Sequence, residues 1–360
     1  MKNGAGEVNS LPKPNNFKKV TFFALMGLLV LVSVEVTAQF LFLARYGNFV
    51  WSQVTGGFNV RSFTRLVTDA RHVTTIPNFS DPKYGGFGIS TDAYGFRGGT
   101  QATRPDCPSV VFIGDSVPFG WGGPDRASMP SRLFDRLQNA NDPRCVINAA
   151  IPSYSLFQAI ARFEREILDE FKIDSVYLQI YDPVTQFVRF GAQWKPDMDW
   201  TTEPVAFASP KREYIASIAI ARNALRRFGV LRGSGSEYFE NFKPADRRSL
   251  DWYRLEIRGE LERLHDLIVK ANVKQLIVAP VTVPADAYQR LSEGRRIAIE
   301  TINDELTQFA ARHKDTSFLD TIELLKGYPG TEVFVDDCCH LSERGNDIVA
   351  EQLIKLLTRK

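Results

Sequence analysis

A serine, a histidine and an aspartate in two short segments have residue types and spacings suited to nucleophilic catalysis. Ser116 closes the sequence Gly114-Asp115-Ser116 directly after an apolar run, and a serine at a strand end can present its hydroxyl to a reacting carbonyl. Asp337 and His340 stand three residues apart in one loop, so the carboxylate can reach the imidazole Nδ1 and leave Nε2 for the serine. We therefore predict Ser116 as nucleophile, His340 as base and Asp337 as the residue that orients the imidazole.

Each of the two segments also has a purely structural interpretation. Ser116 could cap a helix, and His340 could be a solvated loop residue. The segments occur together, one at the end of the first predicted strand and one before the last predicted helix, and this joint occurrence favours catalysis. The other three histidines, His72, His265 and His313, are expected to be solvated or packed.

Short apolar runs alternate with amphipathic helical stretches along residues 106–360, which predicts the elements that position these side chains. The predicted strands are Ser109–Gly114, Cys145–Ala149, Ser175–Tyr181, Lys274–Pro280 and Thr316–Asp320. The predicted helices cover residues 128–139, 156–172, 246–272, 288–313 and 343–358. Strands that alternate with helices predict an α/β fold, a three-layer α/β/α sandwich with a parallel sheet, and such sheets bind ligands at the carboxyl ends of their strands.

Two stretches fall outside this alternation. Residues 45–105 are rich in glycine and turn residues, which predicts a connecting segment of hairpins or loops. An insertion at about residues 183–249 carries four large aromatic side chains, namely Phe187, Phe190, Trp194 and Trp200. The insertion could be a substrate-binding lid or a helical hairpin packed on the core, and its charge does not decide between them.

With these residues the chain resembles the SGNH/GDSL hydrolase family, which comprises esterases and acyl-group hydrolases on a flavodoxin-like α/β/α sandwich. The resemblance covers residues 85–358 apart from the insertion. Gly114-Asp115-Ser116 resembles the first sequence block of the family, and Asp337 with His340 resembles its last block. Tyr94-Gly95-Phe96-Arg97-Gly98 is similar to a segment that precedes the first block in membrane-tethered bacterial members.

The resemblance also implies an oxyanion hole. Residues 148–154 resemble the second block, which implies that the backbone amides of Ser116 and Ser153 hold the oxyanion, with Ser153 in place of the glycine of the family. In the third block the family has an asparagine whose side chain is a further donor, and this chain has Tyr181 there. Loss of one such donor typically lowers the rate by ~10²–10³-fold.

The function that the resemblance implies is that of a serine esterase or deacylase acting on an ester substrate without a metal or organic cofactor. Two alternatives stay open. One is an acyltransferase or deacetylase that acts on cell-envelope glycans, and the other is a non-catalytic SGNH-like binding or assembly module. Tyr181 in place of asparagine favours the non-catalytic module, whereas the three triad residues favour catalysis. The substrate could be an acylated glycan or a lipid.

An apolar stretch near the N-terminus predicts a transmembrane anchor. Residues 20–44 contain one charged side chain, Glu35, and as a helix they are long enough to cross a hydrocarbon core of ~30 Å. A cleaved signal peptide is the alternative, because Val36-Thr37-Ala38 loosely resembles a cleavage site. The length of the apolar run and the apolar residues that would follow the cleavage point favour the anchor.

The charges that flank this stretch predict its orientation. Three lysines precede it closely, namely Lys13, Lys18 and Lys19, whereas Arg45 alone follows it closely. Positive charge tends to stay on the cytoplasmic side of a membrane. We therefore expect residues 1–19 to form a cytoplasmic tail and the hydrolase-like domain, residues 106–360, to lie outside the cytoplasm.

Charge and cysteine content exclude other classes of protein. With 44 basic and 42 acidic residues the net charge is +2, so the chain has no global basic field and nucleic acid is not an expected partner. The four cysteines include no Cys-x-x-Cys pair, which gives no indication of a zinc or thioredoxin-type site. Cys107 and Cys145 fall at the amino ends of two predicted neighbouring strands, so we predict a disulfide between them. Cys338 and Cys339 are expected to be free, packed thiols.

Overall fold

The computed structural model of the chain describes residues 16–46, 64–66, 73–82, 87–98, 104–152, 154–180, 247–291 and 293–358. Several residues named in the sequence analysis lie outside these ranges, namely Lys13, His72, Ser153, Tyr181 and the four aromatic residues of the insertion. Nearly all of the predicted insertion at 183–249 also lies outside the described residues.

A five-stranded parallel sheet forms the centre of the fold. Its strands are β5 (Ser109–Gly114), β6 (Cys145–Asn148), β7 (Ile173–Gln179), β8 (Gln275–Ala279) and β9 (Thr316–Phe318). Their order is β6-β5-β7-β8-β9, and each neighbouring pair is parallel. The chain continues from β5 to β6 on one side and then crosses to β7 on the other side. In sheets with this flavodoxin-like order, ligands bind beside the strand where the direction reverses, at its carboxyl end.

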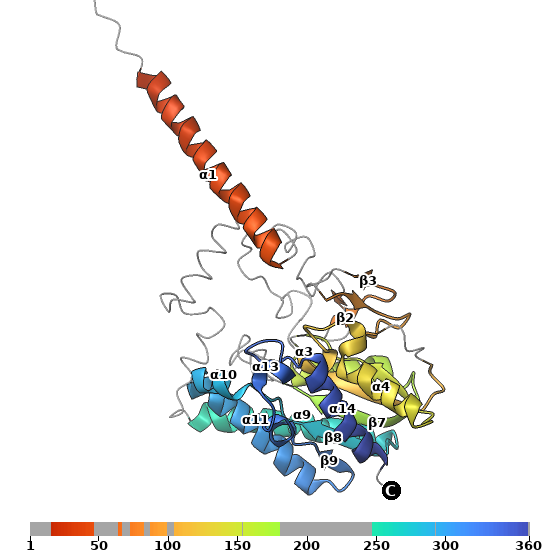
Figure 1. The fold of residues 1–360 in the computed structure, drawn as a ribbon. Coiled ribbons are helices and arrows are strands. Elements are labelled where there is room, and N and C mark those ends of the chain that lie inside the picture. Colours follow the sequence, from red (N-terminus) through yellow and green to blue (C-terminus); the bar gives the residue numbers. More distant parts are fainter. Residues whose placement is uncertain are drawn as a thin grey trace, which may run out of the picture.

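Helices cover both faces of the sheet, as Figure 1 shows. One face packs against α5 (Leu156–Arg162), the π-helical turn η4 (Phe163–Ile167), α9 (Arg247–Lys270) and α11 (Glu293–Arg312). The other face packs against α4 (Met129–Asn139), α12 (Thr321–Leu325), α13 (Gly330–Val333) and α14 (Glu343–Thr358). This arrangement confirms the predicted three-layer α/β/α sandwich.

Apolar side chains on the two faces of β5 contribute to the core on both sides of the sheet. Val111 and Ile113 belong to the cluster under α9 and α11, whereas Val110 and Phe112 belong to the cluster under α4 and α14. Side chains of successive strand residues point to opposite faces, so one strand contributes to both clusters. Full burial of each such side chain contributes roughly 1.5–3 kcal/mol.

Two predicted helices differ from the observed ones in their bounds. The predicted helix 288–313 is divided into α10 (Ala285–Arg290) and α11, because Leu291 has an extended backbone (φ −66°, ψ 148°) that ends α10. The predicted helix 156–172 is regular only to Arg162 and then continues as η4, where a wider turn departs from the period of 3.6 residues. The strands begin and end within two residues of their predicted bounds.

Two small antiparallel hairpins precede the sheet, as the turn-rich composition of this segment predicts. In the first, β1 (Thr64–Leu66) pairs with β2 (Val73–Thr75), and in the second, β3 (Ser80–Asp81) pairs with β4 (Ile89–Ser90). Arg162 joins β2 to the sheet, because its buried guanidinium donates to Thr75 Oγ1 and to the carbonyl of Ala149, both at 2.8 Å. The hairpins therefore pack on the carboxyl edge of the sheet.

A single long helix, α1 (Asn16–Tyr46), contains the predicted anchor (Figure 1). Its stretch Thr21–Leu41 has a mean hydropathy of 2.1 and is long and apolar enough to cross a bilayer. The one charged residue of this stretch, Glu35, accepts a hydrogen bond from Gln39 Nε2 one turn further along, at 2.7 Å. A membrane span and a signal sequence both share these properties of length and composition.

The predicted disulfide between Cys107 and Cys145 is confirmed. The parallel register pairs Ser109 of β5 with Cys145 of β6, and the Cα atoms of the two cysteines lie 5.9 Å apart. The bond links the amino ends of two neighbouring strands. Cys338 and Cys339 are free cysteines, as expected.

Replacing both Cys107 and Cys145 by alanine should lower the free energy of unfolding by about 2–4 kcal/mol. The bond joins residues 38 positions apart and restricts the unfolded chain, so its loss favours unfolding. Urea unfolding of the full chain in detergent micelles measures the change. A reductant is the control, and it should bring the native chain to the stability of the variant while leaving the variant unchanged. Equal stability of the oxidised native chain and the variant would contradict a stabilising disulfide.

Candidate active site

Ser116 stands at the sharp turn between β5 and the short helix α3 (Ser116–Phe119). Gly114 has a φ of 143°, which favours glycine, and a Cβ at this position would lie 1.9 Å from the carbonyl oxygen of Gln179 in β7. Asp115 then caps α3, because its Oδ1 accepts a backbone hydrogen bond at 3.0 Å. These local constraints place the serine at the carboxyl end of β5.

The loop between α13 and α14 carries His340, and backbone hydrogen bonds close this loop. The N–H of Val335 donates to the carbonyl of His340, and the N–H of Ser342 donates to the carbonyl of Val333, both at 2.9 Å. Gly345 in the first turn of α14 packs so closely that an added Cβ would lie 2.3 Å from the carbonyl oxygen of Val333. The backbone of the loop is therefore fixed on both sides of the histidine.

The structure brings Ser116 and His340 together although 224 positions separate them. His340 Nε2 lies 2.8 Å from Ser116 Oγ. On the other side of the ring, Nδ1 lies 2.5 Å from Oδ2 of Asp336. Carboxylate, imidazole and hydroxyl thus form one continuous chain of hydrogen bonds, in the order that a nucleophilic triad requires.

The predicted carboxylate is wrong by one position, because Asp336 and not Asp337 contacts the imidazole. Oδ1 of Asp336 accepts hydrogen bonds from the backbone N–H groups of residues 338–340 at 3.0, 3.2 and 3.3 Å. An aspartate at the start of a turn commonly binds the following backbone in this way, and the turn directs Oδ2 toward the ring. The side chain of Asp337 is 87% exposed and accepts a hydrogen bond from Arg290 at 3.1 Å.

The imidazole and the carboxylate shift each other's pKa. Burial of the ring works to lower the pKa of His340, but the hydrogen bond and the negative charge of Asp336 raise it more, so the pKa lies above its ordinary value of 6.5. Burial works to raise the pKa of Asp336, but the hydrogen bond and charge of His340 and two backbone N–H groups bring it below its ordinary value of 3.8. The carboxylate therefore stays ionised while the imidazole accepts a proton.

The described residues contain one part of the predicted oxyanion hole. Ser116 is the first residue of α3, and the N–H groups of a first helical turn have no intrahelical acceptor. The second predicted donor, Ser153, and the residue in place of the family's asparagine, Tyr181, both lie outside the described residues.

Two amide side chains at this edge of the sheet have structural hydrogen bonds. Asn148 at the end of β6 donates through Nδ2 to the carbonyl of Phe119 at 3.2 Å. Gln179 at the end of β7 donates through Nε2 to the carbonyl of Pro280 at 2.8 Å, and its Oε1 accepts from the hydroxyl of Tyr177 at 3.0 Å. These amides hold the loops that surround the serine, so neither is a ready substitute for the missing asparagine.

Arg97 fixes the loop that follows Ser116, a role that the sequence analysis missed. Its guanidinium donates to the carbonyls of Phe119, Gly120 and Gly123 at 2.8, 2.7 and 2.6 Å, and its Nε donates to Asp125 at 2.8 Å. Asp125 begins the 3₁₀ turn η3, which ends at residue 127. With 1% of its side chain exposed, Arg97 acts on the site through this loop and is a positioning residue. The only signal in the sequence is its place in the Tyr-Gly-Phe-Arg-Gly segment.

A cavity of about 540 Å³ lies where the chain leaves β8. It lies beside the loop of residues 334–342 that carries His340, the candidate catalytic loop. Phe334 belongs to its wall and also pairs with Leu341 at the base of the catalytic loop. Two polar atoms in this wall, Thr282 Oγ1 and Asn303 Oδ1, are buried and have no hydrogen-bond partner among the described residues. The cavity has room for a small organic group next to the catalytic loop.

No family model and no curated protein matches the chain. Solved structures that are similar to it include an acetylxylan esterase from Geobacillus stearothermophilus, with 16% identity over 72% of this chain and 98% of that chain and a TM-score of 0.43. A lipase/acylhydrolase from Enterococcus faecalis has 15% identity over 69% of this chain and 95% of that chain, with a TM-score of 0.43.

A member of the lipolytic protein G-D-S-L family from Veillonella parvula DSM 2008 has 13% identity over 71% of this chain and 100% of that chain, with a TM-score of 0.42. Similarity at this level says nothing about the activity of this chain. Its activity is therefore inferred from the geometry of the site.

Asp336→Asn should lower kcat for ester hydrolysis by ~10³–10⁴-fold, because the imidazole loses the charge that orients it and stabilises its protonated form. Asp337→Asn is the matched control, since it removes a carboxylate one position along the same loop. It should change kcat by less than about twofold, as expected for an exposed ion pair. Hydrolysis of p-nitrophenyl acetate by the full chain measures both. A greater loss in Asp337→Asn than in Asp336→Asn would contradict the observed geometry.

Activity should fall on the acid side with a midpoint above 6.5, the ordinary pKa of histidine. His340 accepts the serine proton only when it is neutral, and its raised pKa keeps it protonated to a higher pH. Asp336→Asn removes the negative charge and should move the midpoint to lower pH, while Asp337→Asn should leave it in place. Profiles of kcat/KM across about pH 5 to 9 measure the midpoints. An identical midpoint in Asp336→Asn and the native chain would refute this coupling.

Proposed function

We propose that the chain is a serine esterase or deacylase of the SGNH/GDSL type that hydrolyses an ester substrate. The observation that carries this proposal is the hydrogen-bond chain from Asp336 through His340 to Ser116, at 2.5 and 2.8 Å. The place of the serine at the carboxyl end of β5, beside the reversal of strand order, supports it because ligands bind such sheets there. Asp336 takes the role that the sequence analysis assigned to Asp337.

In the proposed mechanism, Ser116 Oγ attacks the ester carbonyl while His340 Nε2 takes the proton of the hydroxyl. The tetrahedral intermediate then collapses, the alcohol leaves with the proton from Nε2, and the acyl group stays on the serine. Nε2 next takes a proton from water, which attacks the acyl-enzyme. When this second intermediate collapses, the acid leaves and Nε2 returns the proton to Ser116 Oγ. Asp336 stays ionised throughout and stabilises the imidazolium in both steps.

We assign the developing negative charge on the carbonyl oxygen to the backbone amides of Ser116 and Ser153. The position of Ser116 at the start of α3 supports the first assignment. Among the described residues, the two side-chain amides at this edge of the sheet, Asn148 and Gln179, hold neighbouring loops. A site short of one such donor reacts ~10²–10³-fold more slowly than a complete one.

The proposed enzyme is anchored by α1, with residues 1–19 in the cytoplasm and the domain of residues 106–360 outside it. The length and hydropathy of Thr21–Leu41 support the anchor, and the lysines that precede it support the orientation. The Cys107–Cys145 disulfide is consistent with this placement, because disulfides persist in oxidising compartments.

The cavity beside the catalytic loop supports an ester with a sizeable acyl or alcohol group. Phe334 belongs both to its wall and to the segment that leads to His340, which supports this cavity as a place for part of the substrate. An acylated glycan and a lipid ester both present such a group. Transfer of the acyl group to a sugar hydroxyl would use the same acyl-enzyme, and analysis of the products distinguishes transfer from hydrolysis.

Ser116→Ala and His340→Ala should each lower kcat for p-nitrophenyl acetate by ~10³-fold or more, and the double variant should be little worse than either single one. The two residues act in the same proton transfer, so removing one of them already abolishes the contribution of the other to kcat. Ser317→Ala is the control. Ser317 lies in β9, three strands away from β5 in the sheet, so this variant should keep native activity. Losses that multiply in the double variant would mean that the two residues act independently, which contradicts the proposed mechanism.

A further inference from the structure

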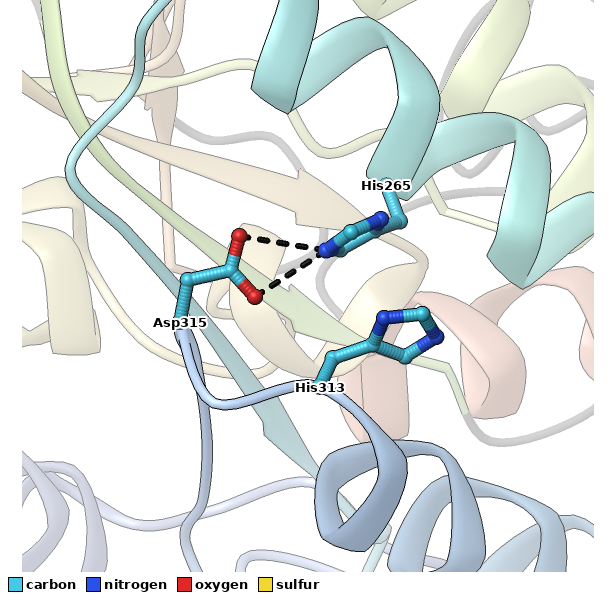
Figure 2. A group of neighbouring side chains, drawn as sticks. All are labelled: His265, His313 and Asp315. Atoms are coloured by element: carbon cyan, nitrogen blue, oxygen red, sulfur yellow. Dashed lines mark hydrogen bonds and ion pairs between the residues drawn. The ribbon is translucent and has the colours of Figure 1, made fainter.

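Three side chains of types that bind metals converge at the amino-terminal edge of the sheet. His265 comes from α9, His313 follows α11, and Asp315 lies just before β9, as Figure 2 shows. Their side chains are 15%, 19% and 37% exposed, so solvent reaches the group. Ser116 stands at the opposite, carboxyl edge of the sheet, so the proposed catalytic mechanism does not use this cluster.

The spacing of the cluster suits one bound ion. One ligand atom from each residue lies within 4.8 Å of the other two, and His265 Nε2 is 3.0 and 3.1 Å from the two carboxylate oxygens of Asp315. In a tetrahedral zinc site with bonds of about 2.0–2.2 Å, neighbouring ligand atoms are separated by roughly 3.3 Å. His265 and Asp315 already have about this separation, and a ring nitrogen of His313 faces them (Figure 2).

The donor types and the close approach of the two rings suit a bound cation. The two imidazole rings are stacked, with centroids 3.9 Å apart and an angle of 37° between the planes. Two imidazoles and a carboxylate are a donor set that Zn²⁺ prefers.

Two charged residues next to the cluster, Glu262 and Arg312, help to orient the ring of His313. Its Nε2 lies 2.9 Å from Oε2 of Glu262, although the N–H is not aligned well enough for a hydrogen bond. Arg312 pairs with the same carboxylate at 3.0 Å and holds it in place. Histidines that bind a metal usually direct their other ring nitrogen to a carboxylate, which fixes the orientation of the ring. Glu262 stands where such a partner is needed.

The backbone around the cluster is already ordered by hydrogen bonds. The N–H of Thr316 donates to the carbonyl of His313 at 3.0 Å, and the N–H of Leu276 in β8 donates to the carbonyl of Asp315 at 3.1 Å. His265 lies between Leu264 and Ile268, residues of the buried stripe of α9 that are 0% exposed. The ligands therefore come from fixed elements, which lowers the cost of bringing them to one ion.

We propose that His265, His313 and Asp315 bind a divalent transition-metal ion of the zinc class, with water as the fourth ligand. The ion would join α9 to the turn between α11 and β9 and so stabilise the amino edge of the sheet. The site does not depend on the proposed esterase function, because its ligands lie at the edge opposite Ser116. The ligands lie far apart in the sequence, with His265 48 positions before His313. A motif of closely spaced metal ligands therefore could not predict the site.

The test uses the full chain without a histidine tag, in detergent micelles, stripped of metal with a chelator and then titrated with ZnCl₂. We expect one zinc per chain by elemental analysis after dialysis, with a dissociation constant in the micromolar range or below. Saturating zinc should also raise the melting temperature by about 5 °C, because the ion binds the folded chain and not the unfolded one. Co²⁺ should give the visible absorption of a tetrahedral site.

His265→Gln and Asp315→Asn should each weaken zinc binding by at least about tenfold and remove the cobalt absorption. Asp304→Asn, which alters an exposed carboxylate on α11, is the matched control and should bind as the native chain does. Unfolding without zinc shows whether each variant is folded. No saturable binding to the native chain, or unchanged binding in both folded ligand variants, would overturn the proposal. Ser116→Ala should bind zinc normally, which separates this outcome from any failure of the proposed catalysis.

Discussion

The hydrogen bond between His340 Nε2 and Ser116 Oγ joins two segments 224 positions apart, and the rest of the fold serves to bring them together. On the serine side, the backbone of Gly114 lies so close to Gln179 that no side chain fits between them. On the histidine side, Gly345 packs in the same way against Val333. Both contacts are made by backbone, so the two segments that carry the side chains of the proposed triad have fixed positions. Such preorganisation removes the cost of ordering them during the reaction.

Different kinds of residue gather at the amino and carboxyl ends of the strands. At the amino edge, the Cys107–Cys145 disulfide links β5 to β6, and the cluster around His265 joins α9 to the start of β9. At the carboxyl edge lie the triad, the loop held by Arg97 and the cavity beside the catalytic loop. The disulfide, and the ion that we propose, would stabilise the first edge without restricting the second.

Periodicity and local motifs predicted the strands, the layers, the disulfide and the pair Ser116 and His340, because each of these follows from short-range pattern or from neighbouring parallel strands. The choice between Asp336 and Asp337 could not be made in this way. It depends on which carboxylate accepts the backbone N–H groups of residues 338–340, a property of turn geometry and not of spacing. The role of Arg97 could not be predicted for a similar reason. Its hydrogen bonds to the loop after α3 join residues that meet only in the folded chain.

The most direct test of the central claim is covalent labelling of the full chain with a fluorophosphonate probe, followed by mass spectrometry of the intact chain and of its peptides. Such a probe reacts with a serine only where a base activates the hydroxyl and the site stabilises the resulting charge. A triad of Ser116, His340 and Asp336 predicts one adduct per chain, located on Ser116 and abolished in Ser116→Ala. A folded native chain that stays unlabelled, or an adduct on another residue that persists in Ser116→Ala, would contradict it.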